Sequence, residues 1–452
     1  WDLTTSYGEN RIEYRSFNTL NATLGAASPT RFYNGALEAG QWTTSVDFTR
    51  DFDAGLNTPL SVAFGIEART DRYAISAGQL ESYQFGPVRV LDGPAAGTVP
   101  TIGAQGFAGI QPGDVIDTDR TNWSVYSEAT VTPVDNLLLT GAVRYENFSD
   151  FGETTNGQAA ARWEIIDGVA LRASVGSGFH APALQQQYFS STSSRTLANP
   201  LTGVPEFVLV RTAPVTAREA RLLGARDLQP ETAVNASAGV TAQRGGFSAS
   251  IDAYQIDIDN RIGLSSNFVD AAGSSSIRNY MASQGLPGVT SVRYFTNVGD
   301  TRTTGVDINA RWRVPTEALG DFTFTLGYNH NETELTRVAT TPQELLALGV
   351  RTPLFDIAER IRTEFGQPED NIQLGAVWEI GPWTIGLRGV RYGEHRALAL
   401  TNQTAAAVAV FRNGATGFYT LPTEAGVAGN FDVIQIIEAK WLADLNVNYQ
   451  IN

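Results

Sequence analysis

The sequence predicts an all-β protein, a large antiparallel β-barrel that crosses a membrane. Polar and apolar residues alternate with a period of two along many segments, aromatic residues recur near both ends of those segments, and short connections alternate with long ones. Successive side chains of a strand point to opposite faces, so this period gives each strand one apolar and one polar face. A membrane barrel turns the apolar face to lipid and the polar face to the lumen, whereas a soluble sandwich packs its apolar faces together.

The alternation is clear at residues 42–48, where Trp42, Val46 and Phe48 share one face. We predict roughly sixteen strands, near residues 1–8, 10–19, 40–52, 60–77, 122–132, 136–148, 156–166, 169–177, 231–243, 246–260, 290–298, 302–314, 320–331, 370–380, 382–392 and 440–451. Strands in globular sheets usually have ~5–6 residues, so these longer segments suit tilted, membrane-spanning strands.

Aromatic residues stand near both ends of several predicted strands. The pairs are Trp1 and Tyr7, Trp42 and Phe48, Phe322 and Tyr328, Trp383 and Tyr392, and Trp441 and Tyr449. At ~3.4 Å per residue and a tilt of ~40°, these separations give a rise of roughly 15–23 Å, close to the height of the apolar band. Aromatic rings with a polar edge prefer the two membrane interfaces, although ordinary strand propensity is the alternative explanation.

The connections predict which side of the membrane each end of a strand faces. Short turns lie near residues 132–136, 166–168, 243–246 and 381–382, and long irregular stretches lie near 78–121, 178–230, 261–289, 332–369 and 393–439. We expect the turns on one side, the long loops on the other, and a single barrel domain over residues 1–452. The charged residues predicted to line its lumen are Asp47, Glu67, Arg69, Arg144, Glu146, Arg172, Asp252 and Arg388.

Composition excludes several other classes of protein. The chain has 32 basic and 47 acidic residues, a net charge of −15, which argues against a partner made of nucleic acid. It has no cysteine, so disulfide scaffolds and thiolate metal sites are excluded. It also has no run of the ~18 apolar residues that a membrane-spanning helix needs.

Motifs for catalysis or metal binding are incomplete. Residues 176–178 resemble a fragment of a nucleophile elbow but do not match G-x-S-x-G. Residues 257–260 resemble the start of a calcium loop, but Phe268 stands where the bidentate glutamate should be. His330 lacks H-E-x-x-H spacing. We therefore predict no enzyme, no metal site and no cofactor.

Four motifs together resemble the C-terminal barrel of TonB-dependent outer-membrane receptors. Residues 171–184 look like the family's strand ending in G-F-R-A-P, with His180 where the family usually has arginine. Residues 228–235 are similar to its L-x-P-E-x-x-x-N motif, and residues 254–262 and 296–307 follow in the family's order. The residues that carry the resemblance are Gly178, Phe179, Ala181, Pro182, Pro230, Glu231, Asn297, Gly299 and Gly305. We interpret the last two as a tight bend between strands, and Pro230 as a strand start where no ladder bond is lost.

The resemblance implies part of a 22-stranded barrel whose lumen holds a plug domain. It implies a transporter in the outer membrane of a Gram-negative bacterium that imports a scarce large solute such as an iron–siderophore complex. The inner-membrane TonB–ExbB–ExbD complex would drive it through the plug, and lipopolysaccharide and other outer-membrane lipid would surround it. Oligosaccharide uptake, cobalamin-type uptake, a passive porin-like channel and an outer-membrane hydrolase or adhesin are the alternatives. We see no plug in this sequence, and we expect further strands before Trp1 and after Asn452.

Two loop regions are candidates for binding the small-molecule ligand, because long loops on such scaffolds carry function. Both regions combine aromatic, amide and charged side chains. Their candidate residues are His180, Gln185, Gln187, Tyr188 and Arg195 in the first region, and Tyr392, His395 and Arg396 in the second.

Overall fold

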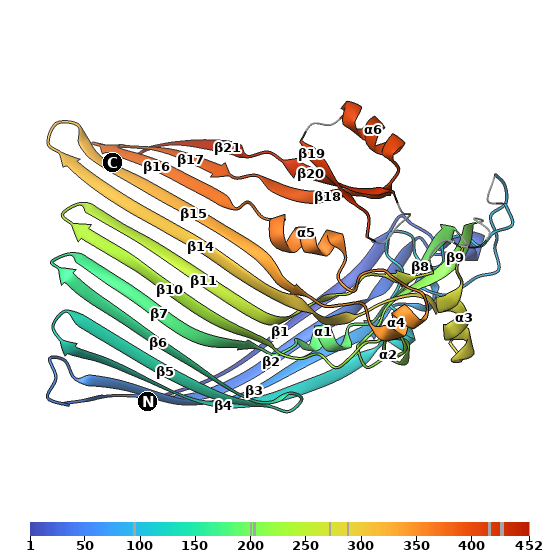
Figure 1. The fold of residues 1–452 in the computed structure, drawn as a ribbon, viewed down its shortest axis with the longest axis horizontal. Coiled ribbons are helices and arrows are strands. Elements are labelled where there is room, and N and C mark those ends of the chain that lie inside the picture. Colours follow the sequence, from blue (N-terminus) through green and yellow to red (C-terminus); the bar gives the residue numbers. More distant parts are fainter. Residues whose placement is uncertain are drawn as a thin grey trace.

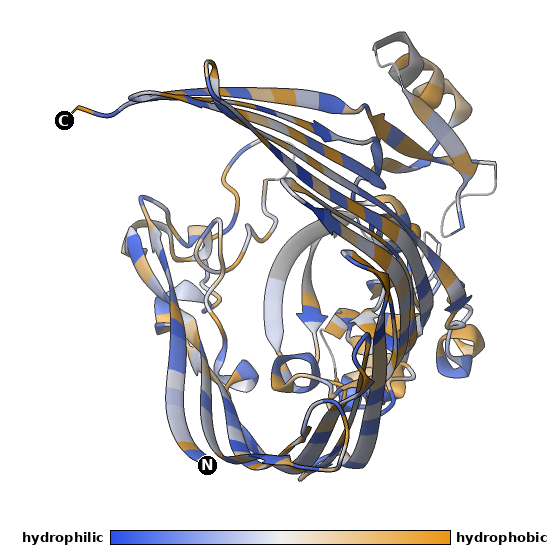
Figure 2. Cartoon of the chain, turned by 90° about the vertical axis from the view of Figure 1, so that its left-hand side faces the viewer, coloured by the Kyte–Doolittle hydropathy of each residue, from blue (hydrophilic) through white to orange (hydrophobic). Residues whose placement is uncertain are grey.

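Fourteen strands form one antiparallel sheet that curls around a central space (Figure 1; Figure 2). The structure is a computed structural model that describes residues 1–451 except 94–95, 199–200, 202–204, 271–272, 287–288, 415–416 and 425–428. The strands of the sheet are, in order, β1 (Asp2–Phe17), β2 (Arg31–Phe52), β3 (Leu60–Ala77), β4 (Ile116–Val134), β5 (Leu137–Phe148), β6 (Gly152–Ile166), β7 (Val169–His180), β10 (Glu231–Arg244), β11 (Phe247–Leu264), β14 (Phe295–Thr316), β15 (Gly320–Val338), β16 (Asp370–Ile380), β17 (Trp383–Tyr392) and β21 (Lys440–Tyr449). The predicted fold class is confirmed.

The predicted number of strands was too high, because two strands were each divided into two. Segments 1–8 and 10–19 belong to β1, whereas segment 290–298 spans the end of β13 and the start of β14, and segment 302–314 continues β14. In β1 the outward face changes from Leu3 and Tyr7 to Glu9 and Arg11 without a break in the pairing with β2. The strand therefore continues beyond the apolar band, where outward side chains no longer need to be apolar.

Short turns and long connections lie at opposite ends of the sheet (Figure 1). The turns at 135–136, 167–168, 245–246, 317–319 and 381–382 mark one end. The other end carries the connections 78–115, 181–230, 265–294, 339–369 and 393–439, close to the predicted stretches, and also the connection 18–30, which was not predicted. One connection at that end, residues 149–151 between β5 and β6, is short.

The long connections are folded rather than irregular, which corrects the sequence-based expectation. Two small sheets have the strand orders β12 (Phe268–Val269), β13 (Val289–Arg293), β9 (Pro205–Thr212), β8 (Ser191–Ala198), and β18 (His395–Gln403), β20 (Phe431–Ile437), β19 (Phe418–Pro422). The helices are α1 (Leu184–Tyr188), α2 (Arg218–Leu222), α3 (Ser276–Ser283), α4 (Gln343–Ala347), α5 (Ile357–Phe365) and α6 (Ala405–Gly414), with 3-10 turns η1 (Ala22–Ala27), η2 (Leu80–Ser82) and η3 (Pro112–Asp114). In the described part of the chain, no helix is long and apolar enough to cross a membrane.

Three of these connections share one hydrophobic core. Leu223, Phe268, Ile277 and Leu345 are fully buried together, although they come from three different connections. Tyr294 lies among them and donates a hydrogen bond from its hydroxyl to the carbonyl of Leu223 at 2.9 Å. Burial raises the pKa of the Tyr294 phenol, because the apolar surroundings disfavour its charged form. The core fixes these connections relative to one another.

The predicted luminal charges all lie on one face of the sheet. In the strand register, Asp47, Glu67, Arg69, Arg144, Glu146, Arg172, Asp252 and Arg388 occupy rows that alternate with rows of exposed apolar side chains. Several are paired: Arg144 donates to Glu67 of β3 at 3.0 Å and to Glu146 of its own strand at 3.1 Å. The alternation thus gives the curled sheet a charged inner face and an apolar outer face.

The sheet order runs from β1 at one edge to β21 at the other. Among the described residues, the ladders recorded for β1 and β21 are those with β2 and β17 respectively. That further strands complete the barrel stays a prediction.

Candidate functional site

The segment after β7 folds back into the mouth of the barrel and is held there by Arg120. The Arg120 guanidinium donates to the carbonyl of Pro182 at 2.9 Å and to the Asp71 carboxylate at 3.1 Å. Its side chain is 8% exposed and lies over the ring of Phe148 at 5.4 Å. A buried cation with these partners fixes the start of α1 against β3 and β4.

An apolar cluster secures the same segment. Leu184 is buried with Tyr73 and Ile75 of β3, and Tyr188 packs against this cluster. Gln187 donates from its amide to Asp150 at 3.2 Å, in the short connection between β5 and β6. As a result α1 lies on the inner face of the sheet, and Gln185 remains exposed.

A polar pocket of about 540 Å³ opens between α1 and the inner wall. The polar residues that line it are Asn10, Gln41, Arg69, Asp71 and Arg120 on the inner face and Gln185 on α1, and Glu9 and Arg72 also line it. Gln41 donates to Asp71 at 2.8 Å, and Arg69 lies 3.4 Å from the same carboxylate. The Arg69 atom in this ion pair is Nε, whereas the Nε atom of Arg120 is buried and has no hydrogen-bond partner in the described structure. The pocket therefore offers amide groups, cations and one shared carboxylate to a polar ligand.

The family-motif residues hold the rim of the barrel together. Phe179 packs against Phe148 in a tilted arrangement, with ring centroids 5.6 Å apart, and Ala181 and Pro182 then lead into the segment held by Arg120. Glu231, which follows Pro230 at the start of β10, accepts the backbone N–H of Ile262 at 2.6 Å. These contacts are structural, as the sequence indicated.

Asn297 joins three parts of the rim. Its amide nitrogen donates to the carbonyls of Gln229 at 2.9 Å and Asn260 at 2.6 Å, and its amide oxygen accepts the N–H of Gln229 at 2.8 Å. An asparagine side chain is both donor and acceptor, so it can replace ladder bonds where β11 and β14 shift register.

We had predicted that two glycines of the motif form a bend between two strands, and this prediction was wrong. Gly299 and Gly305 both lie inside β14, Gly299 beside the register shift with β11. A Cβ on Gly299 would meet the carbonyl oxygen of Arg337 at 2.0 Å. A Cβ on Gly305 would meet the ring of Tyr254 at 2.4 Å, so the absence of a side chain there makes room for the tyrosine ring. No aromatic ring lies against Gly178, where a Cβ would make an ordinary contact with Ala233. Close approach, rather than a turn, requires glycine at the first two positions.

The first group of candidate ligand residues splits between the pocket and its supports. Gln185 lines the pocket, whereas Gln187 and Tyr188 are engaged with the barrel wall. His180 is exposed at the end of β7, where its backbone pairs with Glu231. The side chain of Arg195, on β8, lies outside the described part of the structure.

The second group lies in a separate cluster beyond β17. Arg396 stands over the ring of Phe365 at 4.5 Å and the ring of Tyr419 at 5.8 Å, where β18 packs on α5. His395 is half-buried with Nδ1 unpartnered in the described structure, and Tyr392 is exposed opposite Lys440. Since α1 packs on β3 and β4 while β18 packs on α5 and β20, the two groups form two clusters.

Arg120, Asp71 and Gln41 were not among the predicted ligand residues. Gln41 and Asp71 lie in predicted strands as ordinary polar members of an alternating pattern, whereas Arg120 fell in the predicted long stretch 78–121 and in fact lies on β4. Asp71 and Arg72 are consecutive charged residues and so interrupt the alternation of polar and apolar residues in their strand. This interruption does not show whether a charged residue lines a pocket or only the wall of the barrel.

A family model described as TonB dependent receptor-like, beta-barrel, matches residues 1–452. The chain belongs to this family. Its members are outer-membrane proteins, so this barrel lies in the bacterial outer membrane. The relatives found are receptors and transporters rather than enzymes.

Solved TonB-dependent receptors share the fold at low sequence identity. The siderophore receptor PirA from Acinetobacter baumannii has a TM-score of 0.55 and 13% identity over 100% of this chain and 54% of its own. A mutant of the ferric enterobactin receptor PfeA from Pseudomonas aeruginosa has a TM-score of 0.57 and 12% identity, over 100% of this chain and 52% of its own. The copper transporter OprC has a TM-score of 0.52 and 12% identity, over 100% of this chain and 54% of its own. The chain thus spans about half the length of these structures.

Proposed function

We propose that this TonB-dependent receptor barrel belongs to an active importer of a scarce solute, and that the pocket between α1 and the inner wall receives the ligand on its way into the lumen. The observation that carries this proposal is the pocket itself, at the mouth of a barrel whose inner face is polar. The guanidinium groups of Arg69 and Arg120 beside the pocket, and the Arg120 Nε atom that has no hydrogen-bond partner in the described structure, favour a ligand with hydrogen-bond acceptors.

An iron–siderophore complex is the cargo we favour. PirA and PfeA are described as siderophore and ferric enterobactin receptors, whereas OprC is described as a copper transporter, so relatives of this fold differ in cargo. The acceptor oxygens of a siderophore match the arginine and amide groups of the pocket. Oligosaccharides and cobalamin-type ligands offer acceptors as well and are the alternatives to be tested beside it.

Transport would need energy from the inner membrane. We propose that the TonB–ExbB–ExbD complex acts on this receptor through a plug domain in the lumen, as the family resemblance implies. A passive channel would instead leave solute flow independent of the proton gradient.

The test is uptake by cells that carry or lack the gene. We expect cells with the gene to accumulate a radiolabelled ferric siderophore, and a protonophore to abolish that accumulation. Accumulation that survives the protonophore would favour the porin-like channel, and selective accumulation of labelled maltooligosaccharide or cyanocobalamin would replace the siderophore as cargo.

The pocket is tested by filling it. Gln185→Trp places an indole in the pocket from an exposed position, so we expect uptake to fall about tenfold or more with normal outer-membrane levels of the protein. Gln105→Trp is the matched control, because Gln105 is exposed on a connection at the same end of the barrel and does not line the pocket. Equal uptake by both variants would contradict the assignment of the pocket.

A further inference from the structure

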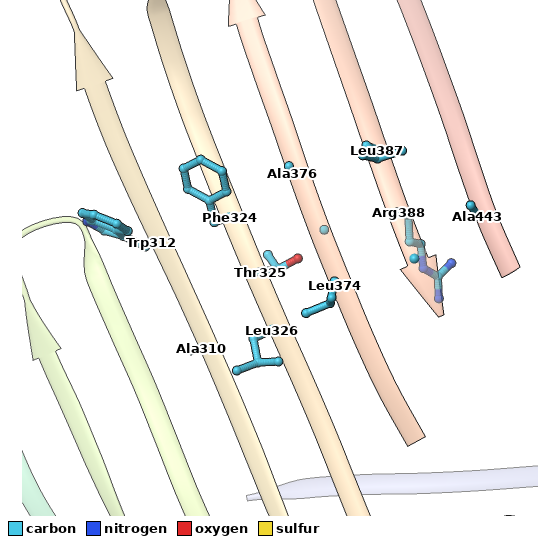
Figure 3. Close-up of a pocket in the computed structure, with 12 residues that line it drawn as sticks. Ala310, Trp312, Phe324, Thr325, Leu326, Leu374, Ala376, Leu387, Arg388 and Ala443 are labelled. Atoms are coloured by element: carbon cyan, nitrogen blue, oxygen red, sulfur yellow. The ribbon is translucent and has the colours of Figure 1, made fainter. Parts of the chain in front are cut away.

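The lining of the pocket beside α1 sets it apart from the hollows of the outer face. The hollow shown in Figure 3, on β14 to β17 and β21, has a similar volume of about 550 Å³ but an almost entirely apolar lining that includes Trp312, Phe324 and Leu387. An apolar outer face is turned to the lipid of the membrane. The pocket beside α1 opens to the lumen and is polar, so its lining bears on the chemistry of the solute.

Arg69 is the least compensated cation of this pocket. The Asp71 carboxylate accepts hydrogen bonds from Gln41 at 2.8 Å and from Arg120 at 3.1 Å. Arg69 Nε lies 3.4 Å from the same carboxylate, an ion pair without a hydrogen bond. Asp150 lies 3.8 Å from Arg120 and compensates that guanidinium further. The two Nη atoms of Arg69 make no hydrogen bond within the described part of the chain, so they can receive an anionic group of a ligand.

The other charged residues that line the pocket are engaged by neighbours. Arg72 donates to the Asp117 carboxylate at 2.9 and 2.7 Å. Glu9 accepts the hydroxyl of Tyr7 at 2.8 Å. The positive charge that a ligand meets in the pocket is therefore chiefly that of Arg69.

A carboxylate is the anionic group whose shape fits this arrangement. A guanidinium is a planar fork that binds the two oxygens of a carboxylate side by side. Arg69 presents such a fork, and the Nε–H of Arg120, which has no partner in the described structure, adds a donor to the same pocket. Further oxygens of a ligand can be bound by the exposed amides of Asn10, Gln41 and Gln185, which come from β1, β2 and α1.

No aromatic residue lines the pocket in the described part of the chain. Of the rings nearby, Phe148 is covered by the Arg120 guanidinium, and Tyr188 packs in the apolar cluster on β3. Tyr14, further along β1, stacks on Phe107 with ring centroids 4.7 Å apart. The aromatic rings of a catecholate would therefore displace water from amides and cations without gaining a ring to stack on.

We propose that the ligand of this pocket is an iron chelate of the α-hydroxycarboxylate type, and that Arg69 selects for its carboxylate. The inference rests on the proposed function in iron import. A carboxylate that does not bind the metal pairs with the Arg69 guanidinium, and the remaining oxygens accept hydrogen bonds from Asn10 and Gln185. A tris-hydroxamate complex of iron(III) is neutral and leaves Arg69 uncompensated, and a tris-catecholate complex brings aromatic rings that the pocket does not match.

The test is equilibrium binding of radiolabelled iron(III) to the purified full-length receptor, with the citrate, enterobactin and ferrioxamine B complexes compared in parallel. We expect the citrate complex to bind most tightly. Arg69→Gln keeps donors but removes the charge, so binding of the citrate complex should weaken about tenfold or more. Arg69→Lys keeps the charge without the fork and should give an intermediate affinity. Arg162→Gln is the matched control, because Arg162 is half-exposed on the same inner face and does not line the pocket.

The expected result is preference for the citrate complex, lost in Arg69→Gln and retained in Arg162→Gln. Asp71 keeps its bonds to Gln41 and Arg120 in the variant, so folding should be preserved, which migration as a folded barrel before heating checks. Tighter binding of the enterobactin or ferrioxamine complex would overturn the ligand class and leave iron import standing. Unchanged citrate binding in Arg69→Gln would overturn the role of Arg69. Failure of all three complexes to bind, and to accumulate in cells that carry the gene, would overturn the proposed function and this inference together.

Discussion

Arg120 is the residue on which the inward position of α1 should depend most. Arg120→Met keeps the length and apolar stem of the side chain but removes its hydrogen bonds to Pro182 and Asp71. A hydrogen bond to a charged group is worth about 1.5–3 kcal/mol. Only the Pro182 bond joins the segment to the wall, because Asp71 and Arg120 both lie on strands of the wall. The Pro182 carbonyl also keeps Gln187 as a second donor at 3.3 Å, so the lower part of the range for one bond applies. A loss of about 2 kcal/mol corresponds to about 30-fold more frequent opening of the segment.

Hydrogen exchange measures this opening directly. The backbone N–H of Phe189 is bonded to the carbonyl of Gln185 at 3.0 Å, so it should exchange about 30-fold faster in Arg120→Met. Arg162→Met is the control, because Arg162 is half-exposed with Glu164 at 3.4 Å, and such pairs contribute little. Unchanged exchange at Phe189 in Arg120→Met would mean that the apolar cluster alone holds α1.

Three further predictions concern the core of the connections and the wall. Tyr294→Phe removes the hydrogen bond to Leu223, leaves a buried carbonyl unpaired and should destabilise the connections by about 1–3 kcal/mol, measured by urea-dependent proteolysis. Because burial raises the pKa of Tyr294, the neutral phenol stabilises the folded connections fully below the ordinary tyrosine pKa of about 10, and this stabilisation is lost as the pH rises above that value. Near-ultraviolet circular dichroism should show the loss of folded structure at high pH in wild type and not in Tyr294→Phe. Gly305→Ala should displace the Tyr254 ring and lower the free energy of unfolding by about 1–3 kcal/mol, measured by thermal unfolding. Gly141→Ala should have no such effect, because a Cβ there meets nothing within 4 Å.

The spanning strands could be predicted because lipid imposes a strict rule on every second side chain. The rule ends where the strand leaves the membrane, which is why β1 was divided near Glu9 and β14 near Gly299. The folded connections could not be predicted in the same way. Leu223, Phe268 and Leu345 meet in one core, but they are far apart in the sequence and belong to no common period.

The candidate site was predictable only in part. Gln185 stands in a polar loop segment next to a recognisable motif, so its type and place both indicated a ligand contact. Arg120 and Asp71 gave no such signal, because their meeting with Pro182 depends on how the segment after β7 folds back across two strands. Long-range placement of this kind is set by tertiary packing rather than by local pattern.

The shared core of the connections also constrains how this receptor can be re-engineered. A loop that packs only against its own residues can be transplanted alone. Connections 181–230, 265–294 and 339–369 instead each contribute side chains to a single buried cluster. Grafting one of them from a relative would leave holes or clashes against the other two. New cargo specificity would therefore have to be introduced by moving the three connections as a set, or by altering the pocket side chains on α1 and the wall while leaving the set intact.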